Sequence, residues 1–310
     1  MNQHLVFQFP GQGSQAVGMG AALCALSPAA AKVFAQADEI LGQALSVVCF
    51  EGPEEVLNDT LTTQPAVLTA SIAALRALEE RLEQPAFVAG HSLGEFSALV
   101  AAQALDFGDA LRLVRERGRL MKEAGETHPG GMAAIIKLET ATVEQVCARV
   151  CQSTGGYVGI ANDNCPGQVV VSGDNVSIAA AMEALQAAGA RKVVRLAVSI
   201  AAHSPLMAEA GALFRQVLDA VEIRPPQIPF VANATASRLS GPDEIRDALG
   251  RQLTSPVYWT EAVRCMIAGG ASRFVEVGPG AVLSGLLRRI DREVEGFTTA
   301  QVLGIEEAYQ

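Results

Sequence analysis

Residues 87–95 read Phe87-Val88-Ala89-Gly90-His91-Ser92-Leu93-Gly94-Glu95, and an apolar stretch follows them over residues 96–105. The apolar residues before Gly90 predict a buried strand, and the longer stretch after Glu95 predicts a helix. Ser92 therefore occupies a strand-to-helix turn within the pattern G-x-S-x-G, the nucleophile elbow of α/β enzymes. The flanking glycines permit a turn sharp enough to expose the serine, and the helix N-terminus directs N–H groups toward charge that develops beside it.

The same residues also fit a simpler interpretation. Ser92 and Glu95 have the spacing of a capping box, in which a serine only begins a helix. The preceding apolar strand and the two glycines favour a nucleophile over a cap, because both belong to the elbow and neither is needed for capping.

The rest of the chain predicts an α/β fold with a mainly parallel sheet. Half of the residues are hydrophobic but only 5% are aromatic, a composition that favours helices packed on a sheet through small side chains. Short apolar runs alternate with longer helical patterns, as in repeated βαβ units. The predicted elements are a strand at 5–9, helices at 29–41 and 64–83, a strand at 87–89, and further strands at 228–232 and 274–277.

A different pattern occupies residues 127–198. It predicts a strand at 132–138, a helix at 142–151, strands at 157–161 and 168–172, a helix at 178–188 and a strand at 192–198. This βαββαβ order is ferredoxin-like. We therefore predict two domains: a large α/β-hydrolase-like catalytic domain formed by residues 1–126 and 199–310, and an inserted ferredoxin-like subdomain at 127–198.

Composition excludes several classes of protein. The net charge is −10 and the chain has no long basic run, which argues against nucleic-acid binding. The first residues resemble no secretory leader, and no apolar run reaches the roughly 18 residues of a membrane span. The six cysteines form no C-x-x-C pair or zinc pattern, so we expect reduced, mostly buried thiols and no metal site. A cytoplasmic protein is expected.

A serine nucleophile needs a base, and the chain has four histidines. His203 follows a strand-like stretch and precedes a Ser-Pro helix start, a position at which α/β proteins collect site residues. It is the candidate base, with a capping or core role as the alternative. His4 opens the first strand, His128 lies in a Pro-Gly loop, and His91 should project away from Ser92 as a structural residue.

The predicted helix at 109–123 carries one charge on its apolar side. Its apolar half contains Ala110, Leu113, Val114, Gly118, Leu120 and Met121, and Arg117 lies among them. A buried guanidinium without an anion is costly, so Arg117 must meet either an internal carboxylate or the carboxylate of a ligand. Arg117 could hold a ligand carboxylate by two parallel hydrogen bonds. An ordinary esterase does not need such an arginine.

The turn after the first strand contains two glycines around Gln12. Its spacing matches neither a dinucleotide-binding motif nor a P-loop. It is either a tight turn or a place from which the Gln12 amide donates to an oxyanion.

Together these motifs resemble the malonyl-CoA:acyl-carrier-protein transacylases of fatty acid synthesis and the acyltransferase domains of polyketide synthases. The resemblance covers nearly the whole chain. The segments that carry it are residues 9–15, residues 90–100, Arg117-Gly118, Asn162 with residues 166–173, and residues 203–207.

The resemblance implies roles for individual residues. Ser92 would be the acylated nucleophile and His203 its base, while Gln12 and the Leu93 backbone N–H would form the oxyanion hole. Arg117 is similar to the arginine that grips the malonyl carboxylate. The backbone carbonyl of Gln252 would orient the histidine in place of a triad carboxylate.

The pocket implied by the resemblance includes His91, Asn162 and Ala202. Ala202 is small, and Ile200-Ala201-Ala202-His203 matches neither motif that accompanies malonyl or methylmalonyl choice in polyketide acyltransferases. Strict malonyl selectivity is therefore a weaker implication than acyl transfer.

The implied activity is ping-pong transfer of malonyl from malonyl-CoA to the phosphopantetheine thiol of acyl carrier protein, without a metal or a bound cofactor. Three alternatives stay open: a trans-acting acyltransferase of a polyketide or malonate decarboxylase pathway, a serine thioesterase or esterase, and a non-catalytic docking module.

Overall fold

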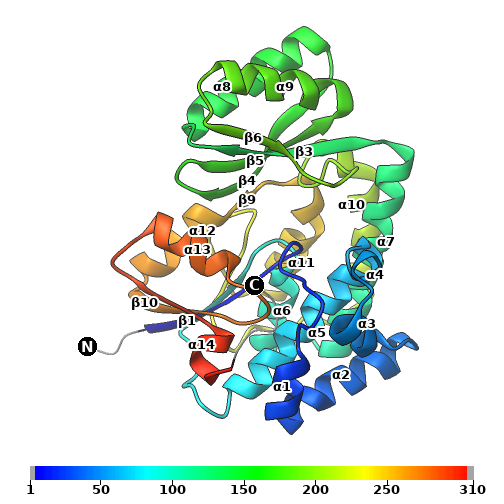
Figure 1. Ribbon diagram of the computed structural model, residues 1–310, viewed down its shortest axis with the longest axis vertical. Helices are drawn as coiled ribbons and strands as arrows, with labels where there is room; N and C mark the ends of the chain where they lie inside the picture. Colours follow the sequence, from blue (N-terminus) through cyan, green and yellow to red (C-terminus); the bar gives the residue numbers. More distant parts are fainter. Residues whose placement is uncertain (1–3, 306–310) are drawn as a thin grey trace.

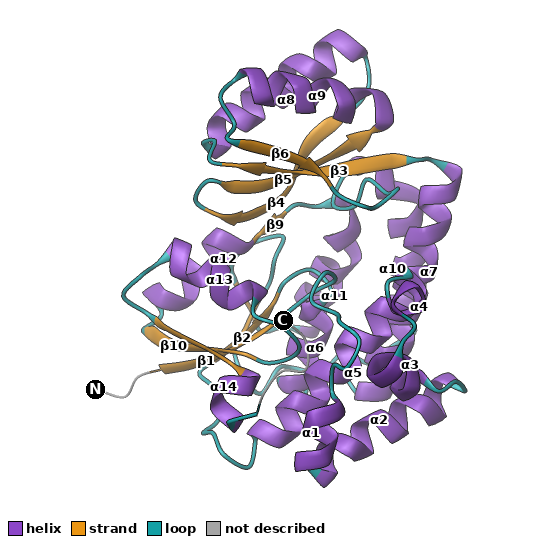
Figure 2. Cartoon of the chain, viewed as in Figure 1, coloured by secondary structure: helices purple, strands orange, loops and turns teal. Residues whose placement is uncertain are grey.

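Two β-sheets organise the chain in the computed structural model, which describes residues 4–305 (Figures 1 and 2). The larger sheet has the strand order β11-β10-β1-β2-β7-β8 and is parallel except for the β7–β8 pair. Its strands are β1 (His4–Phe9), β2 (Phe87–Gly90), β7 (Phe230–Val231), β8 (Arg238–Leu239), β10 (Ala271–Glu276) and β11 (Glu295–Thr298). The mainly parallel α/β fold expected from the sequence is confirmed.

Helices cover both faces of this sheet. They are α1 (Ala21–Leu26), α2 (Pro28–Leu41), α3 (Leu45–Glu51), α4 (Glu54–Leu57), α5 (Thr60–Leu78), α6 (Gly94–Ala101), α7 (Phe107–Thr127), α10 (Ala208–Asp219), α11 (Pro242–Arg251), α12 (Trp259–Ala268), α13 (Val282–Ile290) and α14 (Thr299–Leu303). Alternate side chains of β1 enter different cores, as the two-residue period of a strand requires. Phe7 packs in the core that includes α5, α6 and α7, whereas Val6 packs in the core that includes α12 and α13.

The second sheet lies at the other end of the molecule, with two helices over its outer face (Figure 1). Its strands and helices are β3 (Gly130–Ile136), α8 (Thr140–Thr154), β4 (Val158–Cys165), β5 (Gln168–Asp174), α9 (Asn175–Ala187) and β6 (Lys192–Arg195). Within this βαββαβ segment the strands are antiparallel neighbours in the order β6-β3-β5-β4. A fifth strand, β9 (Val257–Tyr258), pairs parallel to β4. The sheet thus crosses the predicted boundary at residue 198, and the domain limits themselves stay a prediction.

Some predicted elements differ in extent. The helix expected at 64–83 begins at Thr60, because the Asp59 side chain accepts a hydrogen bond from the Leu61 N–H and caps it, and the helix then continues through Pro65. The helix expected from Pro205 begins as a 3₁₀ turn, η1 (Pro205–Met207), before α10, and a second 3₁₀ turn, η2 (Gln252–Thr254), follows α11.

Two further expectations concern the cysteines and the absence of a membrane span. All six cysteines are free, but only Cys49, Cys147 and Cys165 are buried, and the other three are half-buried. Within residues 4–305 no helix combines the length and apolarity that a membrane crossing requires. Residues 1–3, which contributed to the expectation that no leader is present, lie outside the described residues.

Candidate active site

The turn between β2 and α6 holds Ser92 in a left-handed backbone conformation, with φ of 50°. Glycine is required on both sides of it because the backbone is crowded. A Cβ at Gly94 would lie 2.1 Å from the carbonyl oxygen of Phe9, and a Cβ at Gly90 would lie 1.9 Å from the Gly94 carbonyl carbon. The nucleophile elbow predicted from the sequence is therefore pressed against the end of β1.

The capping interpretation of Ser92 and Glu95 is wrong. Helix α6 begins at Gly94 with Leu93 at its N-cap, and no side chain caps it. The Ser92 hydroxyl instead lies 2.8 Å from Nε2 of His203. The positive φ turns this side chain away from the helix and toward the imidazole.

His203 is buried, with 4% of its surface exposed, and both ring nitrogens have partners. Its Nδ1 lies 2.9 Å from the backbone oxygen of Gln252 and 3.2 Å from that of Ser255. Because carbonyl oxygens only accept, Nδ1 carries the proton and Nε2 presents its lone pair to Ser92. Burial, and then the positive charge of Arg117, lower the pKa of His203 to about 3. A neutral imidazole in this position can take the serine proton.

Arg117 projects from α7 into the same site, and its side chain is among the largest that are fully buried. Its Nη2 donates to Ser92 Oγ over 3.1 Å, its Nη1 donates to Gln64 Oε1 over 2.9 Å and contacts the Met121 sulfur, and its Nε donates to Gln252 Oε1 over 2.9 Å. All four partners are neutral, and no ion pair to Arg117 exists among the described residues. Burial lowers the pKa of Arg117 to about 10, so the group remains a cation at neutral pH.

Two buried residues that the sequence reasoning missed connect these groups. Glu95 accepts from the Asn233 N–H over 2.7 Å and from the Gln252 side-chain amide over 2.5 Å. Asn233 in turn accepts from the Ser92 N–H and donates to the Gly90 carbonyl, both over 2.6 Å. Asn233 follows β7, so its place at the carboxyl end of a parallel strand was the available signal.

The side chain of His91, next to the nucleophile, contacts two residues that are distant in sequence. His91 Nε2 is 2.8 Å from Asn164 Oδ1, and its ring meets Trp259 edge-on. The Asn164 contact connects the elbow to β4 of the second sheet. Asn162, predicted to line the pocket, is buried two residues earlier on the same strand.

The remaining predicted residues surround the elbow. Leu93 directly precedes α6, and Ala202 is buried immediately before His203. Gln12 is exposed in the turn after β1, whose Gly11 approaches the backbone of His91 so closely that a Cβ there would lie 2.5 Å from its oxygen. Their predicted roles remain proposals.

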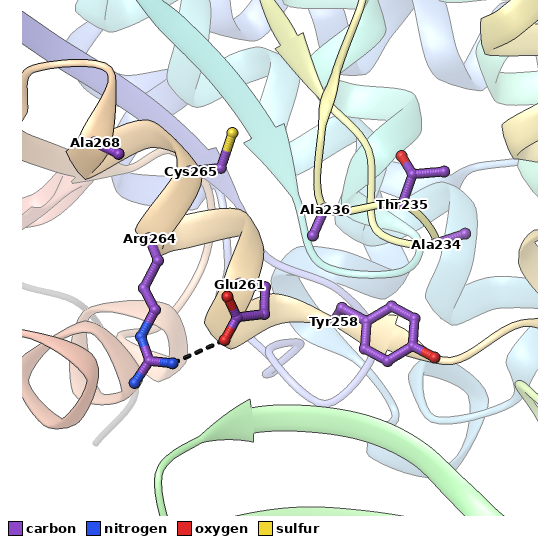
Figure 3. A pocket seen from close by; sticks show the side chains of 8 residues that line it. All are labelled: Ala234, Thr235, Ala236, Tyr258, Glu261, Arg264, Cys265 and Ala268. Carbon is purple, nitrogen blue, oxygen red and sulfur yellow. Dashed lines mark hydrogen bonds and ion pairs between the residues drawn. The ribbon is translucent and has the colours of Figure 1, made fainter.

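A cavity of about 580 Å³ lies elsewhere, between α12 and the segment 234–236 (Figure 3). It is lined by Ala234, Thr235, Ala236, Tyr258, Glu261, Arg264, Cys265 and Ala268. Its charged groups are already paired, since Arg264 donates to Glu261 over 2.7 Å. Neither Ser92 nor His203 borders this cavity, so the chemistry is placed at the serine and not here.

Comparison with known proteins is consistent with this geometry. The family described as "Acyl transferase domain" matches residues 6–308. The malonyl CoA-acyl carrier protein transacylase of Bacillus subtilis is 43% identical over 306 residues, which cover 99% of this chain and 96% of that protein.

Solved structures agree over a similar length. An acyl carrier protein S-malonyltransferase from Vibrio cholerae superposes with a TM-score of 0.92 at 43% identity, covering 96% of each chain. A malonyl-transacylase in complex with its type II polyketide synthase acyl-carrier protein gives 0.94 at 41% identity, covering 97% of this chain and 98% of that one. With the elbow, the histidine and the buried arginine arranged as above, and with matches along nearly its whole length, the chain belongs to the acyl transferase family.

Proposed function

We propose that this chain transfers malonyl groups from malonyl-CoA to the phosphopantetheine thiol of an acyl carrier protein, through an ester on Ser92. One observation carries the choice of malonyl: a buried guanidinium with only neutral acceptors lies 3.1 Å from the serine hydroxyl. A malonyl group has a carboxylate one methylene away from its thioester carbonyl. A malonyl group whose thioester carbon is attacked by Ser92 therefore brings its carboxylate to Arg117, which can hold it by charge-assisted hydrogen bonds.

The first half-reaction forms the ester. Nε2 of His203 takes the proton from Ser92 Oγ, and the oxygen attacks the thioester carbon. The resulting oxyanion is held by the Leu93 backbone N–H, at the start of α6, and by the Gln12 amide. The carbon–sulfur bond then breaks, and the proton on His203 passes to the coenzyme A sulfur.

The second half-reaction reverses these steps with a different thiol. The phosphopantetheine thiol gives its proton to His203 and attacks the Ser92 ester, and the serine oxygen recovers the proton as it leaves. The backbone oxygens of Gln252 and Ser255 hold the imidazole throughout and stabilise its charged form. No metal or bound cofactor takes part in this scheme, and we expect the reaction to occur in the cytoplasm.

A test separates transfer from hydrolysis. The protein is loaded with labelled malonyl-CoA, freed of the excess and left in buffer, and then pantetheine or a holo acyl carrier protein is added. We expect label to stay on the protein in buffer and to leave with the thiol. Rapid release of free malonate in buffer alone would contradict the transfer reaction and favour a thioesterase.

A further inference from the structure

Glu95 is a buried carboxylate that takes no part in the scheme above, although it lies three residues after the nucleophile. We propose that Glu95 is a positioning residue for the malonyl clamp, the Arg117 guanidinium that would hold the malonyl carboxylate. Glu95 acts on Arg117 through the side-chain amide of Gln252. This inference rests on the proposed function and deepens it, because it concerns which acyl group the site accepts.

The hydrogen bonds of the Gln252 side-chain amide hold it in one orientation. Its Nε2 donates to Glu95 Oε2 over 2.5 Å and to the Ser92 carbonyl over 2.9 Å, which uses both of its N–H groups. Its oxygen is thereby turned toward Arg117 and accepts from Nε over 2.9 Å. The reverse orientation would set the amide hydrogens against the guanidinium and the amide oxygen against two acceptors.

The carboxylate is itself fixed. While Oε2 accepts from Gln252, Oε1 accepts from the backbone N–H of Asn233 over 2.7 Å. Two oxygens that both face N–H donors suit an ionised carboxylate, because a protonated one would have to direct its hydrogen at a donor. Burial raises the pKa of Glu95 to about 7, although the Asn233 N–H, the Gln252 amide and the charge of Arg117 all oppose this rise.

The intervening amide explains how the clamp stays available. A carboxylate bonded directly to Arg117 would compete with the substrate, and a cation without any nearby anion would be costly to bury. Placing Glu95 one amide away compensates the charge while Nη2 remains directed at Ser92 Oγ, where the malonyl carboxylate arrives.

The test compares single-turnover acylation by malonyl-CoA and acetyl-CoA. Glu95→Gln can keep the Asn233 bond through its amide oxygen but turns its NH2 group toward the Gln252 donor. Gln252→Met removes the amide and keeps the backbone carbonyl that holds His203. Glu183→Gln, on the exposed face of α9 in the second sheet's layer, is the matched control.

We expect each single variant to lower the malonyl-CoA rate at least about tenfold, the effect of one hydrogen bond to a charged group, through a higher half-saturating concentration. In Glu95→Gln the acetyl-CoA rate should change less than about threefold, and the double variant should lose no more of the malonyl-CoA rate than the worse single variant. Any of three results would overturn the inference: equal losses of the malonyl-CoA and acetyl-CoA rates, an unchanged preference for malonyl-CoA, or a loss in the double variant that equals the product of the two single losses. If Glu95→Gln fails to fold, Glu95→Asp, which keeps the charge but withdraws the carboxylate from the Gln252 amide, decides by the same loss of malonyl preference.

Different results would overturn the proposed function and the role of Glu95. A wild-type chain that malonyl-CoA does not acylate would overturn the proposed function and with it this inference. An acylated wild type whose variants keep their malonyl preference would overturn the role of Glu95 alone.

Discussion

The guanidinium of Arg117 donates to the hydroxyl of Ser92 over 3.1 Å, so the residue that can recognise a carboxylate touches the residue that can be acylated. Arg117 projects from α7, whereas Ser92 lies in the turn between β2 and α6. Recognition and reaction are therefore separated by no more than the length of a malonyl group. A longer dicarboxylic acyl group would place its charge beyond this arginine, and an acetyl group would place none there.

Replacing Arg117 should change which acyl group is used. In Arg117→Ala, acylation by malonyl-CoA should fall by about 30- to 1000-fold, the cost of about 2–4 kcal/mol for losing one partner of a buried charged contact. Acylation by acetyl-CoA should be kept or increased. Arg117→Lys keeps the charge without the planar fork, and should recover only part of the malonyl rate. An unchanged malonyl preference, measured from initial acylation rates, would show that the clamp lies elsewhere.

The histidine predicts an unusual pH dependence. Because the pKa of His203 is lowered from 6.5 to about 3, the imidazole stays neutral as the pH falls through 6.5. Acylation of Ser92 by acetyl-CoA, which does not depend on Glu95, should therefore keep its rate between about pH 7 and pH 5, and lose it only as the pH nears 3, where His203 becomes protonated. Rapid-quench acylation across this range, with circular dichroism as a check on folding, measures it. A rate that halves near pH 6.5 would mean that the histidine titrates normally.

Asn233 should matter to both acyl groups alike. Asn233→Ala removes the acceptor of the Ser92 N–H and the donor to the Gly90 carbonyl. Each of these two buried groups left without a partner costs about 1–3 kcal/mol, so urea denaturation should show a loss of about 2–6 kcal/mol in unfolding free energy. Malonyl and acetyl rates should fall together, in contrast with the Arg117 variants. A selective loss of malonyl transfer would assign Asn233 to the clamp.

The crowding around Gly94 at the elbow can be tested by comparison with Gly285, which faces open space. In Gly94→Ala the new Cβ would lie 2.1 Å from a backbone oxygen, so we expect a loss of about 3 kcal/mol or more in unfolding free energy. Gly285, within α13, has no atom within 4 Å of such a Cβ. Gly285→Ala should be neutral or stabilise by up to about 1 kcal/mol. Similar melting shifts for both would contradict the crowding described here.

Local patterns explain which parts of the site were predictable. The elbow is encoded within nine residues, because a strand, two glycines and a helix start must follow one another. Arg117 was visible through helical periodicity, since a charge on an apolar face stands out. The parallel sheet followed from the alternation of short and long apolar segments, although β9 has only two residues and leaves no periodic signal.

The parts that were missed depend on contacts distant in sequence. Glu95 looked like a capping partner because its spacing from Ser92 fits one, but its carboxylate contacts a residue 138 positions further along the chain. The joining of β9 to β4 likewise connects two segments that the predicted boundary separates. Pairings of this kind are set by the folded backbone and not by any single stretch of sequence.

The central claim is that Ser92 carries the malonyl group, and the intact mass of the protein tests it most directly. The purified chain is treated briefly with malonyl-CoA, beside the Ser92→Ala variant and a parallel sample with acetyl-CoA. We predict one malonyl adduct on the wild type, none on Ser92→Ala, a smaller acetyl adduct in the parallel sample, and removal of the malonyl adduct by a carrier-protein thiol. A malonyl adduct of the same size on Ser92→Ala would contradict the assignment of the nucleophile and the mechanism built on it.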